Sequence, residues 1–245
     1  MKQTLLTTAL ALTFPLCATA QPAGDDIDRD DHIVTKIIDM NDAEYQWDEF
    51  KEKKGKALIK NDCIELEAKK EIVSTCTDLP LDMEKDIFNV RLYMIPDKLD
   101  NKGHIGFVFD KEDSDNYKMF TLTKKGCELS YVKDGKISSK YRGMYKPFKY
   151  NPNLDNDDDL KKNINGSANE DKTALRLPDN TKDLLVLKIA RRGKNVTFSI
   201  NGVELYKGKN IIMSNPTFGY VASEGYKLNG YGLIFTKVET EEIID

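Results

Sequence analysis

Apolar and polar residues alternate along most of this chain, and turn residues interrupt the alternation at roughly ten-residue intervals. Large apolar residues stand at every second position of segment 195–200, and Ile105, Phe107 and Phe109 stand two apart in segment 104–110. A period of two places these residues on one face of a β-strand, whereas a helix requires a period near 3.6. The sets expected to face a core are Ile105, Phe107 and Phe109, and Val196, Phe198 and Ile200.

Short turn signals between the strands predict hairpins and set their register. Asn201-Gly202 and Asp134-Gly135 suit type I′ turns, in which both central residues need a positive φ. Lys125-Gly126 and Arg192-Gly193 separate two further pairs of strands. The facing pairs predicted from the turns are Ile200 with Val203, Phe198 with Leu205, and Val132 with Ile137.

The pattern as a whole predicts an all-β protein. Further strands are expected at 57–60, 87–95, 104–110, 217–223 and 231–239, which gives roughly a dozen in all. One short helix is expected around Asp42 to Lys53. Because strands and helices do not alternate, a parallel α/β sheet is excluded, and a two-sheet antiparallel β-sandwich is predicted.

The first 20 residues resemble a secretory signal peptide. Lys2 precedes an apolar run, and Ala18-Thr19-Ala20 predicts cleavage before Gln21 and a secreted or periplasmic protein. The run is shorter than the roughly 20 residues needed to span a bilayer, and no later stretch is long and apolar enough. Lipidation at Cys17 is an alternative, although Leu16 directly before it fits poorly.

The rest of the chain is predicted to be a flexible segment followed by one domain. Residues 21–32 are rich in Gly, Pro and Asp, and residues 33–245 form the predicted sandwich, with an acidic, solvated loop inserted at about 151–183. Removing one Lys with the leader changes the net charge from −4 to −5. A mildly acidic chain without a broad basic surface does not favour nucleic-acid binding.

The cysteines allow one disulfide in an exported protein. If residues 62–77 form a hairpin that turns at Lys69-Lys70, Cys63 faces Cys76 at a closely spaced position. The alternative is two small buried thiols, and Lys-Lys is a poor turn sequence. Cys127 is expected to be a buried, unpaired thiol.

The order of several short motifs resembles the concanavalin A-like lectin and glucanase jelly rolls, in particular small secreted bacterial domains of the 3-keto-disaccharide hydrolase type. The motifs are Ile64-Glu65-Leu66-Glu67, Phe88-Asn89-Val90-Arg91, Gly106-Phe107-Val108-Phe109-Asp110, Asp115-Asn116-Tyr117 and Phe198-Ser199-Ile200-Asn201-Gly202, and a strand that begins near Gly219 follows them. The resemblance covers about residues 45–239 and implies a sugar-binding groove on one sheet. A Glu-x-Asp-x-x-Glu run, the catalytic strand of one glucanase branch, does not occur.

Polar and aromatic residues on the strands and loops supply candidate ligand contacts. Sugars stack on aromatic rings, and charged or amide groups bond their hydroxyls. If Val90, Leu92 and Met94 face the core, Arg91 and Tyr93 lie on the open sheet face; a buried structural ion pair of Arg91 is the alternative. The predicted ligand-binding residues are Arg91, Tyr93, Asp110, Asn116, Tyr131, Tyr141 and Tyr145.

The acidic loop after the 104–110 strand has two interpretations. Asp110, Asp113 and Asp115 could hold Ca²⁺, which prefers several oxygen ligands on a bent loop. In the other interpretation, these side chains cap backbone amides within an Asp/Asn-rich turn. No other cofactor is indicated.

These features favour a non-catalytic carbohydrate-binding sandwich. Two alternatives remain open. The first is a glycoside hydrolase-like enzyme, which needs two carboxylates roughly 5–10 Å apart in the groove. The second is a surface module for protein–protein interaction, which would need a flat sheet face with exposed apolar residues. The sequence leaves the glycan and the oligomeric state open.

Overall fold

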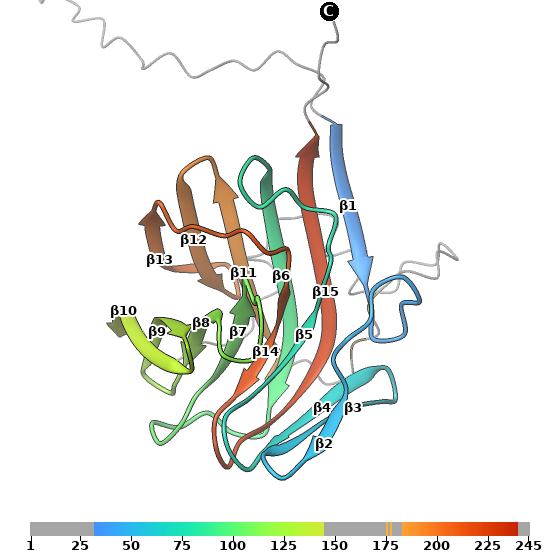
Figure 1. Cartoon of the computed structure of the whole chain (residues 1–245), viewed down its shortest axis with the longest axis vertical. Helices are drawn as coiled ribbons and strands as arrows, with labels where there is room; N and C mark the ends of the chain where they lie inside the picture. Colours follow the sequence, from blue (N-terminus) through green and yellow to red (C-terminus); the bar gives the residue numbers. More distant parts are fainter. Residues whose placement is uncertain (1–31, 145–174, 176, 178–182, 240–245) are drawn as a thin grey trace, which may run out of the picture. The chain divides into compact units, whose positions relative to one another are not determined.

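The computed structural model describes residues 32–144, 175, 177 and 183–239, and this part of the chain is all-β (Figure 1). The larger sheet contains β1 (His32–Ile38), β2 (Phe50–Glu52), β3 (Gly55–Lys60), β4 (Cys63–Ala68), β6 (Ile87–Pro96), β11 (Leu185–Arg192), β12 (Asn195–Ile200), β13 (Val203–Lys209) and β15 (Lys227–Glu239). The smaller sheet contains β5 (Ile72–Cys76), β7 (Ile105–Phe109), β8 (Tyr117–Leu122), β9 (Gly126–Lys133), β10 (Lys136–Met144) and β14 (Phe218–Ala222). The described residues include no helix that could cross a membrane.

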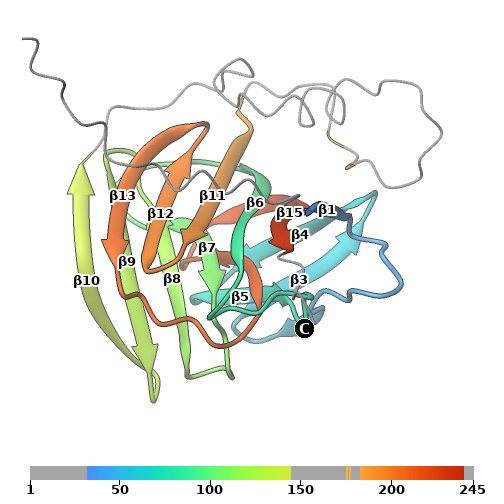
Figure 2. The same cartoon turned by 90° about the horizontal axis from the view of Figure 1, so that it is seen from above.

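Both sheets are antiparallel, as the alternation predicts. The larger sheet has the order β13-β12-β11-β6-β15-β4-β3-β2, and β1 pairs with the second half of β15. The smaller sheet has the order β10-β9-β8-β7-β14-β5. Figure 2 shows β8, β9 and β10 beside β11, β12 and β13 of the other sheet. The predicted two-sheet antiparallel β-sandwich is therefore confirmed.

The core lies between the two sheets and is rich in aromatic rings. Phe198 of β12 stacks on Phe120 of β8, with ring centroids 4.6 Å apart, and lies 5.4 Å from the Phe109 ring of β7. Phe107 in turn stacks on Phe109 and on Phe218. Because aromatic pairs at these distances add to the free energy of burial, they join the inner faces of both sheets. The two sets of alternate residues predicted to face the core do so.

The predicted hairpins form, with one change of register. Asn201, Gly202, Asp134 and Gly135 all have positive φ values. The pairs Ile200 with Val203 and Val132 with Ile137 occur as predicted. The prediction for Phe198 was wrong, because a β-bulge next to it shifts its partner from Leu205 to Tyr206. An extra residue on one strand is a local irregularity that a turn sequence does not indicate.

The predicted helix around Asp42 to Lys53 was wrong. The Asp42 carboxylate accepts hydrogen bonds from the backbone N–H groups of Glu44 and Tyr45, which closes a turn. Trp47 then forms a β-bridge with Cys76, and its ring stacks 5.3 Å from the Tyr220 ring. This tertiary burial of Trp47 outweighs the weak local preference for a helix.

The predicted disulfide was also wrong. Cys63 lies on β4 of the larger sheet and Cys76 on β5 of the smaller one, and both are free and buried. The chain crosses between the sheets at Lys69-Lys70 and does not form a hairpin there. Cys127 is a buried free thiol, as predicted. Burial raises the pKa of Cys76 to about 12, so this thiol stays protonated and unreactive at neutral pH.

One tyrosine connects the two sheets by hydrogen bonds. The Tyr220 hydroxyl of β14 lies 2.8 Å from the carbonyl oxygen of Gly232 and 3.1 Å from that of Tyr93, and it accepts a bond from the Gly232 N–H at 3.0 Å. Gly232 has a φ of +109° next to a β-bulge in β15. The N–H and the carbonyl of Gly232 both bond the Tyr220 hydroxyl of the opposite sheet, and the Tyr220 side chain is fully buried.

Candidate functional site

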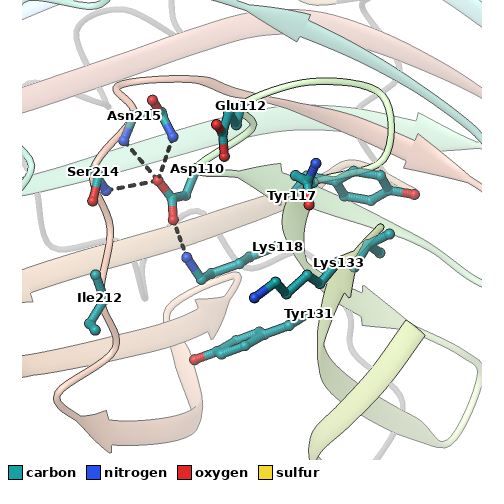
Figure 3. Close-up of a pocket in the computed structure, with 11 residues that line it drawn as sticks. Asp110, Glu112, Tyr117, Lys118, Tyr131, Lys133, Ile212, Ser214 and Asn215 are labelled. Carbon is teal, nitrogen blue, oxygen red and sulfur yellow. Dashed lines mark hydrogen bonds and ion pairs between the residues drawn. The ribbon is translucent and has the colours of Figure 1, made fainter. Parts of the chain in front are cut away.

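A cavity of about 310 Å³ opens where β7, β8 and β9 meet the segment between β13 and β14 (Figure 3). It combines two tyrosines with ammonium, amide and carboxylate groups. The residues around it are Asp110, Glu112, Asn116, Tyr117, Lys118, Tyr131, Val132, Lys133, Ile212, Ser214 and Asn215. Three of the predicted ligand-binding residues, Asp110, Asn116 and Tyr131, therefore lie in one place. This arrangement fits a site for a small polar ligand, because such sites combine apolar surface with a few fixed polar groups.

Asp110 fixes one wall of the cavity. It follows β7 with a φ of +52°, and its side chain is buried. One carboxylate oxygen accepts bonds from the backbone N–H groups of Ser214 and Asn215, at 2.8 and 2.7 Å, and from the Asn215 side-chain amide. The other oxygen pairs with the Lys118 ammonium group. The carboxylate thus holds the β13–β14 segment against β8.

Tyr131 is the tyrosine of the cavity that lies beside its lysines. It is half-buried on β9, and Lys118 pairs with it in the register of β8 and β9. The ammonium groups of Lys118 and Lys140 both lie 5.3 Å from the ring centroid. Burial, with smaller effects of Tyr206 and Asp110, raises the pKa of Tyr131, so its hydroxyl stays protonated and can donate a hydrogen bond. Figure 3 shows Lys118 and Lys133 beside this ring.

The acidic loop forms a turn that its own side chains cap. Asp113 accepts hydrogen bonds from the Asp115 N–H at 2.7 Å and from the Asn116 amide, and the Asn116 oxygen accepts one from the Asp134 N–H. Asp110 is bonded to Lys118 and to backbone amides. Within the described residues, no group of three His, Cys, Asp or Glu side chains could hold a metal ion. Asp110 and Asp113 thus cap backbone and amide groups of the chain, and Ca²⁺ at Asp110, Asp113 and Asp115 stays a prediction.

The other predicted ligand contacts lie elsewhere. Arg91 and Tyr93 are 3% and 0% exposed, so their placement on an open face was wrong. They do lie on the outer side of β6, as the core positions of Val90, Leu92 and Met94 require. Tyr93 lies in a second apolar cluster on that side, with Leu175, Leu184, Val186, Tyr231 and Ile234 among its members. The burial of Arg91 agrees with the alternative prediction, in which this side chain has a structural role inside the protein.

Tyr141 belongs to the packing of the sandwich edge. Its ring lies 4.3 Å from that of Tyr206, and its hydroxyl donates to the Leu205 carbonyl. Tyr145 lies outside the described residues, as does nearly all of the predicted 151–183 loop. Tyr141 is therefore not among the residues of the cavity described above.

Several cavity residues are missing from the predicted set. Lys118 lies on the same side of β8 as Phe120 and Leu122, which face the core, so its side chain points inward and reaches Asp110 at the sandwich end. Ser214 and Asn215 reach the cavity only through the folding of the β13–β14 segment. The one local signal for this cavity is the residue type of Asp110 at the end of β7, because Asp tolerates the positive φ that it adopts there.

A second cavity of about 360 Å³ lies between the β5 edge of the smaller sheet and the 47–54 segment, and its residues include Asp48, Glu49, Glu71, Lys111 and Tyr117. Glu71 bonds the His104 ring at 2.8 Å and accepts from the Tyr117 hydroxyl at 3.0 Å. Burial acts to raise the Glu71 pKa, but the hydrogen bond and charge of His104, together with Tyr117, hold this pKa below its ordinary value. Glu71 is therefore an ionised structural group at neutral pH.

Replacing Glu71 with glutamine is expected to lower the free energy of unfolding by about 1 kcal/mol at pH 7, the usual value of a hydrogen-bonded pair. Because the folded pKa of Glu71 is depressed, its contribution is complete above the ordinary pKa of 4.5 and is lost as the pH falls through the folded value. The difference between the two proteins should therefore shrink from pH 5 towards pH 3. Urea unfolding at a series of pH values measures it, and the exposed Glu52→Gln variant should show no such trend.

The fold and the cavity define an antiparallel two-sheet β-sandwich with a polar site at one end. No family model and no curated protein matches the chain. Among solved structures, a carbohydrate-binding module from Bacillus subtilis is 10% identical, with 75% of this chain and 91% of that chain covered and a TM-score of 0.48. The Emp46p carbohydrate recognition domain in a potassium-bound form is 9% identical, with 78% and 88% covered and a TM-score of 0.47.

A Bacillus subtilis protein of unknown function with a galectin-like fold is 12% identical, with 79% of this chain and 90% of that chain covered and a TM-score of 0.44. With TM-scores below 0.5, these likenesses carry no argument about what this chain binds. The function has to be argued from the cavity itself, because one sandwich fold supports many activities.

Proposed function

We propose that this protein binds carbohydrate, without cleaving it, in the cavity formed around Asp110, Lys118 and Tyr131. The observation that carries the proposal is the position of the half-buried Tyr131 ring beside ammonium and amide groups in one cavity. A sugar ring has apolar C–H faces and a rim of hydroxyl groups. The Tyr131 ring suits the first, and the amides of Asn116 and Asn215 with the ammonium of Lys133 suit the second.

The rigidity of the cavity wall favours binding. Four hydrogen-bonding or ionic contacts fix Asp110 to Lys118, Ser214 and Asn215 before a ligand arrives. Groups that are already ordered lose little conformational entropy on binding. A ligand of a few sugar units would be held by stacking and by hydrogen bonds to Asn116 and Lys133.

The cavity carboxylates do not suit a glycoside hydrolase. Such an enzyme needs one carboxyl with a raised pKa as general acid and a second as nucleophile or base. Both oxygens of Asp110 already bond groups of the chain itself, Lys118 on one and the amides of residues 214 and 215 on the other. In the second cavity, the Glu71 pKa is lowered, which is the wrong direction for an acid catalyst.

Replacing Tyr131 with alanine is expected to weaken glycan binding tenfold or more, the effect of removing a central aromatic contact of roughly 1–2 kcal/mol. Tyr131→Phe keeps the ring and should stay within about threefold of the wild type. A glycan array followed by calorimetry with the best ligand measures both. Lys125→Ala, at the turn between β8 and β9, serves as the control.

Thermal unfolding of each variant checks that the fold is intact. The proposal is rejected if the wild type binds no glycan on the array, or if Tyr131→Ala binds as tightly as the control.

We also propose that the protein is exported, as the leader and the cleavage pattern before Gln21 suggest. Mass spectrometry of the protein recovered from a secreting host is expected to show a mature chain that starts at Gln21. A chain that still carries the first 20 residues, or a lipid on Cys17, would contradict this expectation. The finer resemblance to 3-keto-disaccharide hydrolase-type domains also stays a prediction.

A further inference from the structure

A shallow groove of about 300 Å³ lies on the outer face of β11, β12 and β13, in the larger sheet. Its floor is formed by the short side chains of Ala190, Thr197 and Ser199. Thr197 and Ser199 point outward because their neighbours on β12, Val196, Phe198 and Ile200, point into the core. Ala190 lies on β11 next to the core residue Ile189 and faces Thr197. The groove belongs to a different sheet and a different set of residues from the Tyr131 cavity.

The strand register explains why this face is hollowed. Ala190 faces Thr197, and Thr197 faces Lys207 on β13. Lys188 faces Ser199 one step further along β11. The long side chains of β11 and β13 therefore flank Thr197 and Ser199 of β12. Together with Ala190, these short side chains form the floor of the groove.

The groove is positively charged although the whole chain is negative. Lys188, Arg192 and Lys207 line it together with a single acid, Glu204, so three cations and one anion give +2 in a protein of net charge −4. Arg192 and Lys207 are exposed to solvent. Guanidinium and ammonium groups bind carboxylate and sulfate oxygens through charge-assisted hydrogen bonds.

The charges are spread along the strands. Lys188 and Arg192 are four residues apart on β11, which is about 13 Å at the rise of a strand. Lys207 lies on the opposite side of the floor. This spacing suits several anionic groups on an extended chain better than one small anion. Thr197, Ser199 and Asn195 add hydroxyl and amide groups between the cations.

We propose that this groove binds an acidic polysaccharide, one that carries carboxylate or sulfate groups along its length. Its cations meet the anionic groups, and its hydroxyl and amide floor meets the sugar hydroxyls. Among the described residues that line the groove there is no aromatic ring. Single-stranded nucleic acid depends on such rings for base stacking, so the groove favours an acidic sugar chain over a nucleic acid. This site is independent of the proposed cavity.

The test is retention of the whole protein on immobilised heparin and polygalacturonate, with neutral dextran and a single-stranded DNA oligonucleotide as comparisons. At 0.15 M salt, the triple variant K188Q/R192Q/K207Q is expected to bind both acidic polysaccharides roughly tenfold more weakly, since each exposed charge pair contributes modestly. The matched control K51Q/K70Q/K125Q removes the same charge from exposed lysines elsewhere and should bind like the wild type.

Glu204→Gln provides a change in the opposite direction. It removes the one acid of the groove and is expected to strengthen binding about two- to threefold, a result that a damaged fold cannot produce.

Three outcomes would overturn the proposal. The first is a wild type that neither acidic polysaccharide retains. The second is an equal loss of binding in the groove and control triple variants, which would show an effect of net charge only. The third is tighter binding of the DNA oligonucleotide than of either polysaccharide.

Discussion

Replacing Asp110 with alanine is expected to destabilise the protein by about 3 kcal/mol and to abolish ligand binding in the cavity. The substitution removes the partner of the Lys118 ammonium group, whose side chain is only 18% exposed. It also leaves the backbone N–H groups of Ser214 and Asn215 without their acceptor. Each buried donor that loses its partner adds to the desolvation cost. Urea unfolding measures the stability, and glycan calorimetry measures the binding.

A double-mutant cycle separates the ion pair from the rest of this effect. Lys118→Met removes the cation, and the double variant D110A/K118M no longer has an unpaired ammonium group. We expect the double variant to be more stable than the sum of the single changes predicts, by about 1–3 kcal/mol. Additive effects would mean that Lys118 and Asp110 do not stabilise each other, and the role assigned to the pair would be wrong.

Replacing Tyr220 with phenylalanine is expected to destabilise the protein by about 2–3 kcal/mol, although only one oxygen atom is removed. The ring can keep its place against Trp47, so little packing is lost. The lost hydroxyl leaves the Gly232 N–H and the Gly232 carbonyl without the partner that the structure gives them. Because the Gly232 groups are buried, water cannot replace the tyrosine oxygen as their partner.

Tyr45→Phe is the matched control for this change. The Tyr45 hydroxyl donates to Glu44, whose carboxylate side chain is 66% exposed, so water can take its place. Its loss should cost about 0.5 kcal/mol or less. Urea unfolding of both variants at pH 7 gives the comparison. If the two changes cost the same, the bonds of Tyr220 across the sandwich do not contribute to stability.

The hairpins were predictable from the sequence because their information is local. Asn201-Gly202 and Asp134-Gly135 have the positive φ values that the residue types favour. The alternate residues of these strands then face the core as expected, and the sandwich follows. The same logic failed at Lys69-Lys70, where facing cysteines suggested a hairpin although Lys-Lys is a poor turn sequence, and the chain crosses to the other sheet.

The outer faces were less predictable than the core. Alternation correctly gave the side of β6 on which Arg91 and Tyr93 lie, but it says nothing about what covers that side. Residues distant in sequence do so, since Leu175 and Ile234 belong to the same cluster as Tyr93. Covering contacts of this kind depend on tertiary structure, and neither a strand period nor a turn signal encodes them.

The candidate cavity was partly predictable. Asp110, Asn116 and Tyr131 were identified by residue type, as polar or aromatic groups at strand ends. Their common position follows from the β7–β8–β9 register, whereas Ser214 and Asn215 lie about a hundred residues further along the chain. The turn-capping role of Asp113 illustrates the limit, because capping and Ca²⁺ binding use the same residue types.

The pairing of β1 with β15 has a consequence for the order of folding. Thr35 faces Thr236, a separation of 201 residues, and β15 also pairs with β4 and β6 in the middle of the larger sheet. β4 and β6 therefore cannot complete their pairing until residues 227–239 are available. The hairpins of the smaller sheet can form earlier, so the half-made larger sheet is the stage at which chaperones would be most needed.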